Sequence, residues 1–580
     1  MRLTDWVVVA AYLGITLAVG IWLARRASGG LVEFFVSGRS LPWWLAGTSM
    51  AATTFSVDTP LYVTGLVARR GIAGNWEWWA FALSHVLLIY VFARLWRRAE
   101  VVTDVELTEM RYGGRPAAVL RASRAFLFAV PINCIAIGYV MLAMRKVIEV
   151  LGLFDQLPGW LPGDPRLWAV VALSAFVLLY AGLAGLWGVV ATDFFQFVLA
   201  MLGALIVAAF ALQEIGGVAE LKHQLAAAGR SEALRMVPRP GSAELPFGTF
   251  LAYLGIQWWA FRRSDGGGEF VQRLSACRDE REAERAAWLF NILHYVVRAW
   301  PWIIVALAAV VVFPELLEPG GDPEIGYPLL MLRYLPAGLL GLVVASFLAA
   351  FMSTVSTQIN WGASYLVNDL YARFIEPEAS PRKLVALGRA ASVVIVALAG
   401  AAAFSADDVG KVFRFMIAIG TGPGAVLILR WFWWRINAWA ELSAMIAGFA
   451  IAVTSYLPFW GEIGFGLRLT ITAGGAAMIW IPVMLLTAPE DERTLCAFYE
   501  RVRPGGPGWK RIRERVGVEA VTGLTGDLVR TAWAALALLS GTLALGALLL
   551  TEWQVLLLTG GLAAVGLTGL LRLRARRVSA

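Results

Sequence analysis

A run of oxygen-bearing side chains interrupts one of the most apolar stretches of the chain, LAAFMSTVSTQINWGASYL, residues 348–366. The run comprises Ser353, Thr354, Ser356, Thr357, Gln358 and Asn360. On a helix, all of these except Gln358 fall with Ala350 in one sector roughly 160° wide. A single Ser or Thr usually bonds to its own helix or to a neighbouring one. Four hydroxyls within five positions instead favour a site for a small hard cation, which oxygen atoms bind well.

A second candidate is Asp193, an ionisable residue in the apolar segment GLWGVVATDFFQFVLAMLGA. An intramembrane carboxylate is costly and is by default a functional candidate. Asp is also a good helix N-cap, and the preceding ATD sequence follows a short turn after Trp187. Both interpretations remain open from the sequence.

Two apolar segments carry charges and helix-breaking residues in their interior. Segment 43–69 is interrupted by TTFSVDTP, with Asp58 in mid-span, and segment 246–276 is interrupted by RRSDGGGEF, which contains Arg262 and Arg263. Paired interrupted helices in two halves of a chain are typical of inverted-repeat transporters, which bind substrate and ions where the helices unwind. About sixteen apolar residues, roughly 24 Å of helix, precede the arginines. We therefore expect at least one arginine to face a wet cavity, where it pairs with Asp58 or binds an anionic substrate group.

The composition places these residues in a polytopic membrane protein. Of 580 residues, 59% are hydrophobic and 16% charged, and the mean hydropathy is +0.68. Hydropathy predicts about fifteen transmembrane helices, and the distribution of Lys and Arg among the loops predicts the N-terminus outside and the C-terminus in the cytoplasm. The net charge of +8 thus reflects orientation and not nucleic-acid binding. The three Cys and three His residues follow no metal-ligand spacing, which argues against thiol or metal chemistry.

Four stretches resemble the sodium/solute symporter family, which includes sodium/proline, sodium/galactose and sialic acid symporters. They are VEFFVSGRSLPWWLAGTSMAA, GLWGVVATDFFQ, QRLSACRDEREAERAAW and ASFLAAFMSTVSTQINWGASYLVNDLYARF. The resemblance implies an all-α, inverted-repeat (5+5) LeuT-like fold with one helix before a ten-helix core.

On this basis we divide the chain into seven parts. These are an additional helix and inner loop (1–42), the first repeat (43–213), an outer loop (214–245), the second repeat (246–433), two peripheral helices (434–487), a cytoplasmic amphipathic segment (488–528), and a C-terminal helix pair with a basic tail (529–580).

The resemblance also implies which residues bind Na⁺. The common sodium site would use the backbone carbonyls of Ala52, Phe55 and Ala350 and the hydroxyls of Ser353 and Thr354. A second sodium site, found in some members, would use Ser353 with Asp193, Ser356 and Thr357.

In sugar-transporting relatives, substrate contacts come from positions matched here by Ser56, Asp58, Thr59, Trp76 and Glu77. From the residues alone, Trp76 is more typical of an aromatic belt at the membrane interface. We add Gln257, Arg262 and Arg263 from the second interrupted segment. The RRSDGGGEF sequence departs from the pattern of sugar transporters, so sugar specificity does not carry over.

These features predict a sodium-coupled symporter in the cytoplasmic membrane that imports a small polar solute by alternating access. The mixed charges near the breaks favour a carboxylate-bearing or zwitterionic solute. We expect the solute, Na⁺ and the lipid bilayer as partners, with no nucleic acid and no obligate protein partner. Alternatives are a proton-coupled carrier that uses Asp58 or Asp193, a membrane-embedded enzyme, and a transporter-like sensor.

Overall fold

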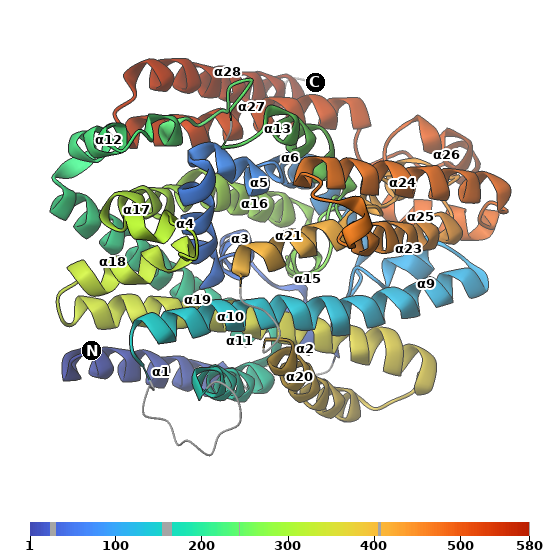
Figure 1. Cartoon of the computed structure of the whole chain (residues 1–580). Coiled ribbons are helices and arrows are strands. Elements are labelled where there is room, and N and C mark those ends of the chain that lie inside the picture. The colour runs from blue at the N-terminus through green and yellow to red at the C-terminus, as the bar shows by residue number, and fades with distance from the viewer. Residues whose placement is uncertain (24–30, 154–164, 243, 404–407, 579–580) are drawn as a thin grey trace.

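The computed structural model describes residues 1–23, 31–153, 165–242, 244–403 and 408–578. The regular secondary structure of this part of the chain is helical, and it contains no β-strand beyond two isolated bridges, Leu41 with Cys277 and Phe261 with Thr421. Many helices run roughly parallel to one another, with α1 (Leu3–Leu23) at one edge and α28 (Trp553–Val578) at the opposite edge (Figure 1). The predicted all-α class is therefore confirmed.

Eight helical segments among the described residues are long and apolar enough to cross a membrane. They are Gly114–Val150, Leu186–Ile215, Glu280–Val312, Leu339–Ile375, Pro381–Ala403, Phe465–Leu486, Leu524–Leu549 and Trp553–Arg574. A bent pair, Ile72–Trp79 with Ala82–Ala99, would make nine. Other predicted spans are divided into shorter helices, so the count of fifteen and the orientation of the termini stay predictions.

Both predicted interruptions are present. Helix α3 (Trp43–Thr53) ends before a short break, and α4 (Asp58–Arg70) begins after it. The second segment consists of α13 (Phe247–Ala252), a π-turn at Tyr253–Gln257, α14 (Trp258–Ala260), a loop, and α15 (Glu269–Ala276). Gly268 at the end of this loop has φ +64°, and an added Cβ would lie 3.1 Å from the Trp361 ring, so the position favours glycine.

Long helices surround the first break. Helix α19 (Leu339–Ser364) packs against α11 (Pro165–Ile215) and α3, and α16 (Glu280–Asn291) packs on α3 from another direction. A π-turn, Ile292–Val297, leads from α16 into α17 (Ala299–Val312). The predicted spans 166–187 and 188–213 are one helix, α11. Asp193 therefore lies inside a helix, which excludes the N-cap interpretation.

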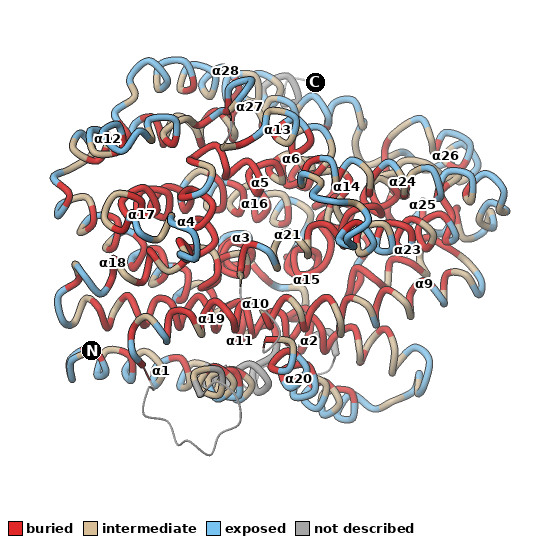
Figure 2. The backbone as a smooth tube through the Cα atoms, in the orientation of Figure 1, coloured by how far each residue is buried: buried red, intermediate tan, exposed pale blue. Residues whose placement is uncertain are grey.

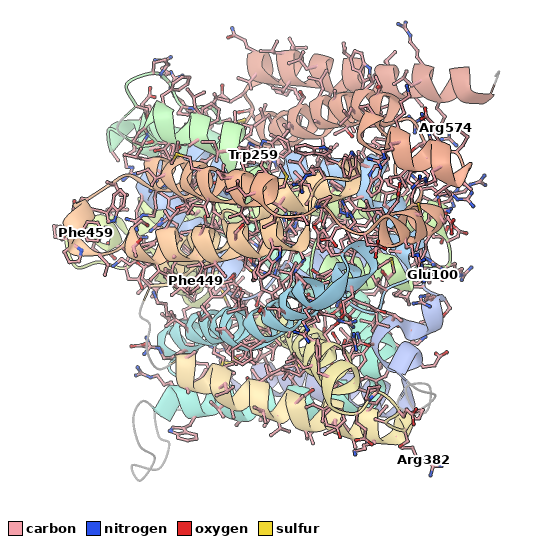
Figure 3. The ribbon with its side chains drawn as sticks, turned by 90° about the vertical axis from the view of Figure 1, so that its right-hand side faces the viewer. Glu100, Trp259, Arg382, Phe449, Phe459 and Arg574 are labelled. Carbon is pink, nitrogen blue, oxygen red and sulfur yellow. The ribbon has the colours of Figure 1, made fainter. Side chains whose placement is uncertain are left out.

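Burial is concentrated in the centre of the molecule, around α3, α15 and α16, while the outer helices α20 (Pro381–Ala403) and α28 are largely exposed (Figure 2). Apolar side chains such as Phe449 of α23 (Ala438–Thr454) and Phe459 beyond it point outward (Figure 3). An apolar lateral surface of this kind is typical of a protein surrounded by lipid.

The amphipathic segment 488–528 forms α25 (Glu492–Val502) and α26 (Lys510–Val516). In the structure this segment is docked on the core. Trp509 is buried and donates its indole N–H to the Trp431 carbonyl at 2.7 Å, and Arg98 donates to the carbonyl of Val502.

Candidate functional site

The break between α3 and α4 faces the hydroxyl-rich part of α19. The Thr354 Oγ1 atom lies 3.2 Å from the Thr53 carbonyl oxygen and 3.4 Å from that of Phe55. Ala52, Ala350 and Ser353 are buried on the same two helices. The chain therefore brings main-chain carbonyls of an unwound segment to the side-chain oxygens of a neighbouring helix, a donor set suited to a small hard cation.

Next to this position, Asp193 is fully buried in a hydrogen-bonded cluster. Its carboxylate accepts hydrogen bonds from Ser353 at 2.6 Å and from Ser49 at 2.5 Å. The guanidinium of Arg273, on α15, lies 3.7 Å from Asp193 and donates to Thr357 at 2.6 Å. Of the other predicted ligands of a second sodium ion, Ser356 donates to the Ser353 carbonyl. Arg273 thus contributes a positive charge to this cluster.

A cavity of about 200 Å³ lies beside the same break and reaches Thr354. This volume is below the roughly 300–1,000 Å³ of drug-sized pockets. Five predicted substrate residues line it, namely Ser56, Asp58, Thr59, Arg262 and Arg263. Residues from further helices complete much of the wall and include Trp78, His85, Tyr139, His294, Tyr295 and Arg298.

The other three predicted substrate residues, Trp76, Glu77 and Gln257, are not among the described residues that line the cavity. Each has a partner elsewhere. The Trp76 indole donates to the Met236 carbonyl at 2.8 Å, and Gln257 donates to the Glu77 main-chain carbonyl at 2.6 Å. Of the residues in the short helix Trp76–Trp79, Trp78 lines the cavity.

The buried Glu77 carboxylate joins four elements. It forms an ion pair with Arg70 at 2.8 Å, accepts hydrogen bonds from Tyr62 and Tyr253 at 2.9 Å each, and lies 3.8 Å from Arg414 of α21 (Val409–Gly420). These contacts are those of a structural anchor, because they use both carboxylate oxygens.

The charged residues around the cavity differ in the partners that they contact. Arg263 forms an ion pair with Glu269 at 2.6 Å, and Asp58 accepts a hydrogen bond from the Tyr139 hydroxyl. The predicted pairing of Asp58 with Arg262 or Arg263 is absent from the ion pairs of the described residues. Arg262 instead stacks on the rings of Phe128 and Phe261, with centroid distances of 5.2 and 5.7 Å.

Arg298, between the Ile292–Val297 π-turn and α17, was missed by the sequence analysis. It donates to the Ala51 carbonyl at 2.8 Å and to Thr54 at 3.1 Å, and lies 3.2 Å from the ring of His294. An arginine in the apolar sequence HYVVRAWPW, four residues after a histidine, is the signal that could have identified it. Tyr139 carries no comparable signal, since tyrosine is common in membrane helices.

Several buried polar atoms at the cavity have no hydrogen-bond partner among the described residues. Among the described residues, the buried side-chain atoms without a hydrogen-bond partner include Ser56 Oγ, Asp58 Oδ1, Glu269 Oε2, Arg298 Nε and Gln358 Oε1, and all five residues line it. Buried polar atoms are normally satisfied. Their accumulation here indicates a site that binds a polar ligand.

Comparison with known proteins agrees with this arrangement. Residues 34–448 match the sequence model of the Sodium:solute symporter family. The chain is 26% identical to the sodium/glucose cotransporter of Vibrio parahaemolyticus over 506 residues, covering 80% of this chain and 88% of that protein. It is 27% identical to the sodium/mannose cotransporter SLC5A10 of Bos taurus over 494 residues, covering 78% and 79% respectively.

Among solved structures, the fold is similar to that of a Na⁺-coupled sialic acid symporter in a substrate-bound, outward-open state. The TM-score is 0.67 at 20% identity, and the match covers 84% of this chain and 99% of the other. At this identity the likeness shows the fold alone. Because the sequence relatives are sodium cotransporters, an enzyme is excluded as the function. The family match covers most of the chain, and the protein therefore belongs to the sodium:solute symporter family as a multi-pass, Na⁺-coupled membrane transporter.

Proposed function

We propose that the protein imports a small polar organic solute by alternating access, with one Na⁺ bound between the α3–α4 break and α19. The ligands would be the carbonyls of Ala52, Phe55 and Ala350 and the hydroxyls of Ser353 and Thr354. The observation that carries this proposal is the position of Thr354, whose hydroxyl contacts the Thr53 and Phe55 carbonyls and which also lines the solute cavity.

This position explains how ion and solute can be coupled. Na⁺ would tie α19 to the break at which the solute binds, so each ligand would favour the same conformation of the break. Coupling then arises from the different affinities of two conformations for the ion. The proposed inverted repeat, residues 43–213 and 246–433, would supply the two halves that move against each other.

For the solute, we propose a carboxylate-bearing or zwitterionic molecule held by Ser56, Asp58, Thr59, Arg262 and Arg263. The support is the cavity lining, in which arginines outnumber carboxylates. A second Na⁺ at Asp193, Ser356 and Thr357 would require Arg273 to withdraw from Thr357, so our proposal assigns one ion.

A thermal-shift screen tests the coupling. Purified protein would be heated with a set of small metabolites in NaCl and in choline chloride of equal ionic strength. We expect a ligand that raises the melting temperature only in NaCl, because a ligand stabilises the state that binds it. A ligand that stabilises equally in both salts would contradict sodium coupling.

A further inference from the structure

Arg262 is the one cavity arginine that the described residues leave without an acidic or hydrogen-bonding partner for its guanidinium. Arg263 is paired with Glu269 at 2.6 Å, and Arg298 donates to Ala51 and Thr54. The guanidinium of Arg262 contacts two aromatic rings, and the residue is only 6% exposed. Desolvating an ion without pairing it is costly, and ring stacking compensates only part of that cost.

The main chain holds Arg262 firmly at this place. Its N–H donates to the Gly420 carbonyl at 2.8 Å, and Gly422 N–H donates to the Ala260 carbonyl at 2.9 Å. An added Cβ at Gly420 would lie 2.4 Å from the Phe261 ring and 3.3 Å from Arg262 Cδ. The break after α14 is thus fixed against the end of α21, and the guanidinium is positioned before any solute arrives.

The charges of the cavity lining do not balance. Among the described lining residues, three arginines (Arg262, Arg263 and Arg298) face two carboxylates (Asp58 and Glu269), which leaves one positive charge before the histidines His85 and His294 are counted. His294 does not change this sum. Its Nε2 lies 3.2 Å from an Arg298 nitrogen, which can only donate, so Nε2 is an acceptor and the ring is neutral.

From these observations we infer that the solute is a small organic monoanion whose carboxylate binds Arg262. This inference rests on the proposed function, because it assigns the solute of the same cavity. A carboxylate can accept two parallel hydrogen bonds from a guanidinium, and its charge would neutralise the cavity. A zwitterion or a neutral sugar would leave the positive charge of the cavity uncompensated.

Two other lining residues, Asp58 and Ser56, select for a donor on the same molecule. The buried Oδ1 atom of Asp58 has no hydrogen bond within the described part of the chain, and Tyr139 donates to the other oxygen of Asp58. A hydroxyl on the solute could donate to Asp58 without adding charge. The class that fits both Arg262 and Asp58 is therefore a small hydroxycarboxylate of the size that a cavity of about 200 Å³ admits.

The test compares solutes matched in size and different in charge. Lactate, alanine and glycerol form one set, and glucuronate and glucose another, each measured by thermal shift in NaCl and in choline chloride. We expect the carboxylates, and not alanine, glycerol or glucose, to stabilise the protein in NaCl. A response to the neutral or zwitterionic members, or to no carboxylate, would overturn the inference. Stabilisation by carboxylates in both salts would instead leave this inference standing and contradict sodium coupling.

Variants of Arg262 connect the response to this residue. Arg262→Gln should weaken carboxylate binding about tenfold or more, and Arg262→Lys should retain part of it because the charge remains. Arg262→Gln should not lower the melting temperature of the ligand-free protein, since it removes an unpaired buried charge. The control is Arg333→Gln, because Arg333 also stacks on aromatic rings, Phe313 and Tyr334, but is exposed and outside the cavity lining. Equal carboxylate affinity in Arg262→Gln and wild type would overturn the assignment.

Discussion

Arg273 and Asp193 lie 3.7 Å apart at a fully buried position, and the same guanidinium donates to Thr357 at 2.6 Å and to Ser49 at 3.1 Å. The two residues are 80 positions apart in the chain and lie on α11 and α15. Their contact links α11 to α15, the last helix of the second interrupted segment. It also satisfies oxygens that the sequence suggested for a second sodium ion.

We therefore expect sodium to activate transport with a Hill coefficient of about 1, because a single ion site gives no cooperativity. The measurement is initial uptake into proteoliposomes as a function of Na⁺ concentration at saturating solute. A coefficient of about 2 would contradict the one-ion proposal.

Replacing Arg273 should destabilise the protein. In Arg273→Gln the buried Asp193 loses its cation, and breaking a buried ion pair on one side costs about 3–5 kcal/mol. Arg273→Lys keeps the charge, so its melting temperature should lie between those of wild type and Arg273→Gln. Thermal melting in detergent without solute measures this effect, and an unchanged melting temperature in Arg273→Gln would show that the pair carries no stability.

Thr354→Ala should weaken sodium activation, by roughly tenfold if the hydroxyl contributes about 1.4 kcal/mol to ion binding. Thr354→Ser retains the hydroxyl and should stay close to wild type. Ser364→Ala is a matched control on α19, because among the described residues its hydroxyl bonds only to the Trp361 carbonyl, at 2.7 Å. The sodium concentration for half-maximal uptake is the readout, and equal values in Thr354→Ala and Ser364→Ala would exclude Thr354 as a ligand.

The sequence was sufficient for the elements whose signal is local. The apolar segments, the two interruptions and the hydroxyl run on α19 follow from composition and spacing, and the structure brings Thr354 to the first break. The sequence was insufficient where the contacting residues lie far apart in the chain. Nothing near Glu77 in the chain indicates that Tyr253 and Arg414 enclose it, and nothing near Asp193 indicates Arg273. Aromatic residues of the cavity, such as Trp78 and Tyr139, cannot be told from ordinary membrane-helix residues before the packing of the helices is known.

Asp58→Asn separates sodium coupling from proton coupling. We expect uptake to fall, because a hydrogen-bond acceptor of the cavity is changed, while the remaining uptake still requires Na⁺. In sodium-free buffer, acidification should drive no uptake in wild type. Tyr139→Phe, which removes the hydroxyl that donates to Asp58, is the companion variant and should also lower solute affinity. Acid-driven uptake without Na⁺ that disappears in Asp58→Asn would favour the proton-coupled alternative.

Glu77→Gln tests whether this residue is a substrate ligand or a structural anchor. Its carboxylate is fully buried and contacts Arg70, Tyr62 and Tyr253. Removing the charge leaves Arg70 without its acidic partner, so we expect the free energy of unfolding to fall by about 3 kcal/mol. Glu232→Gln is the control, because Glu232 forms an exposed ion pair with Arg235 whose loss should change stability little. Solute affinity of the folded Glu77→Gln protein should remain near that of wild type. A loss of solute affinity without loss of stability would instead indicate that Glu77 is a substrate ligand.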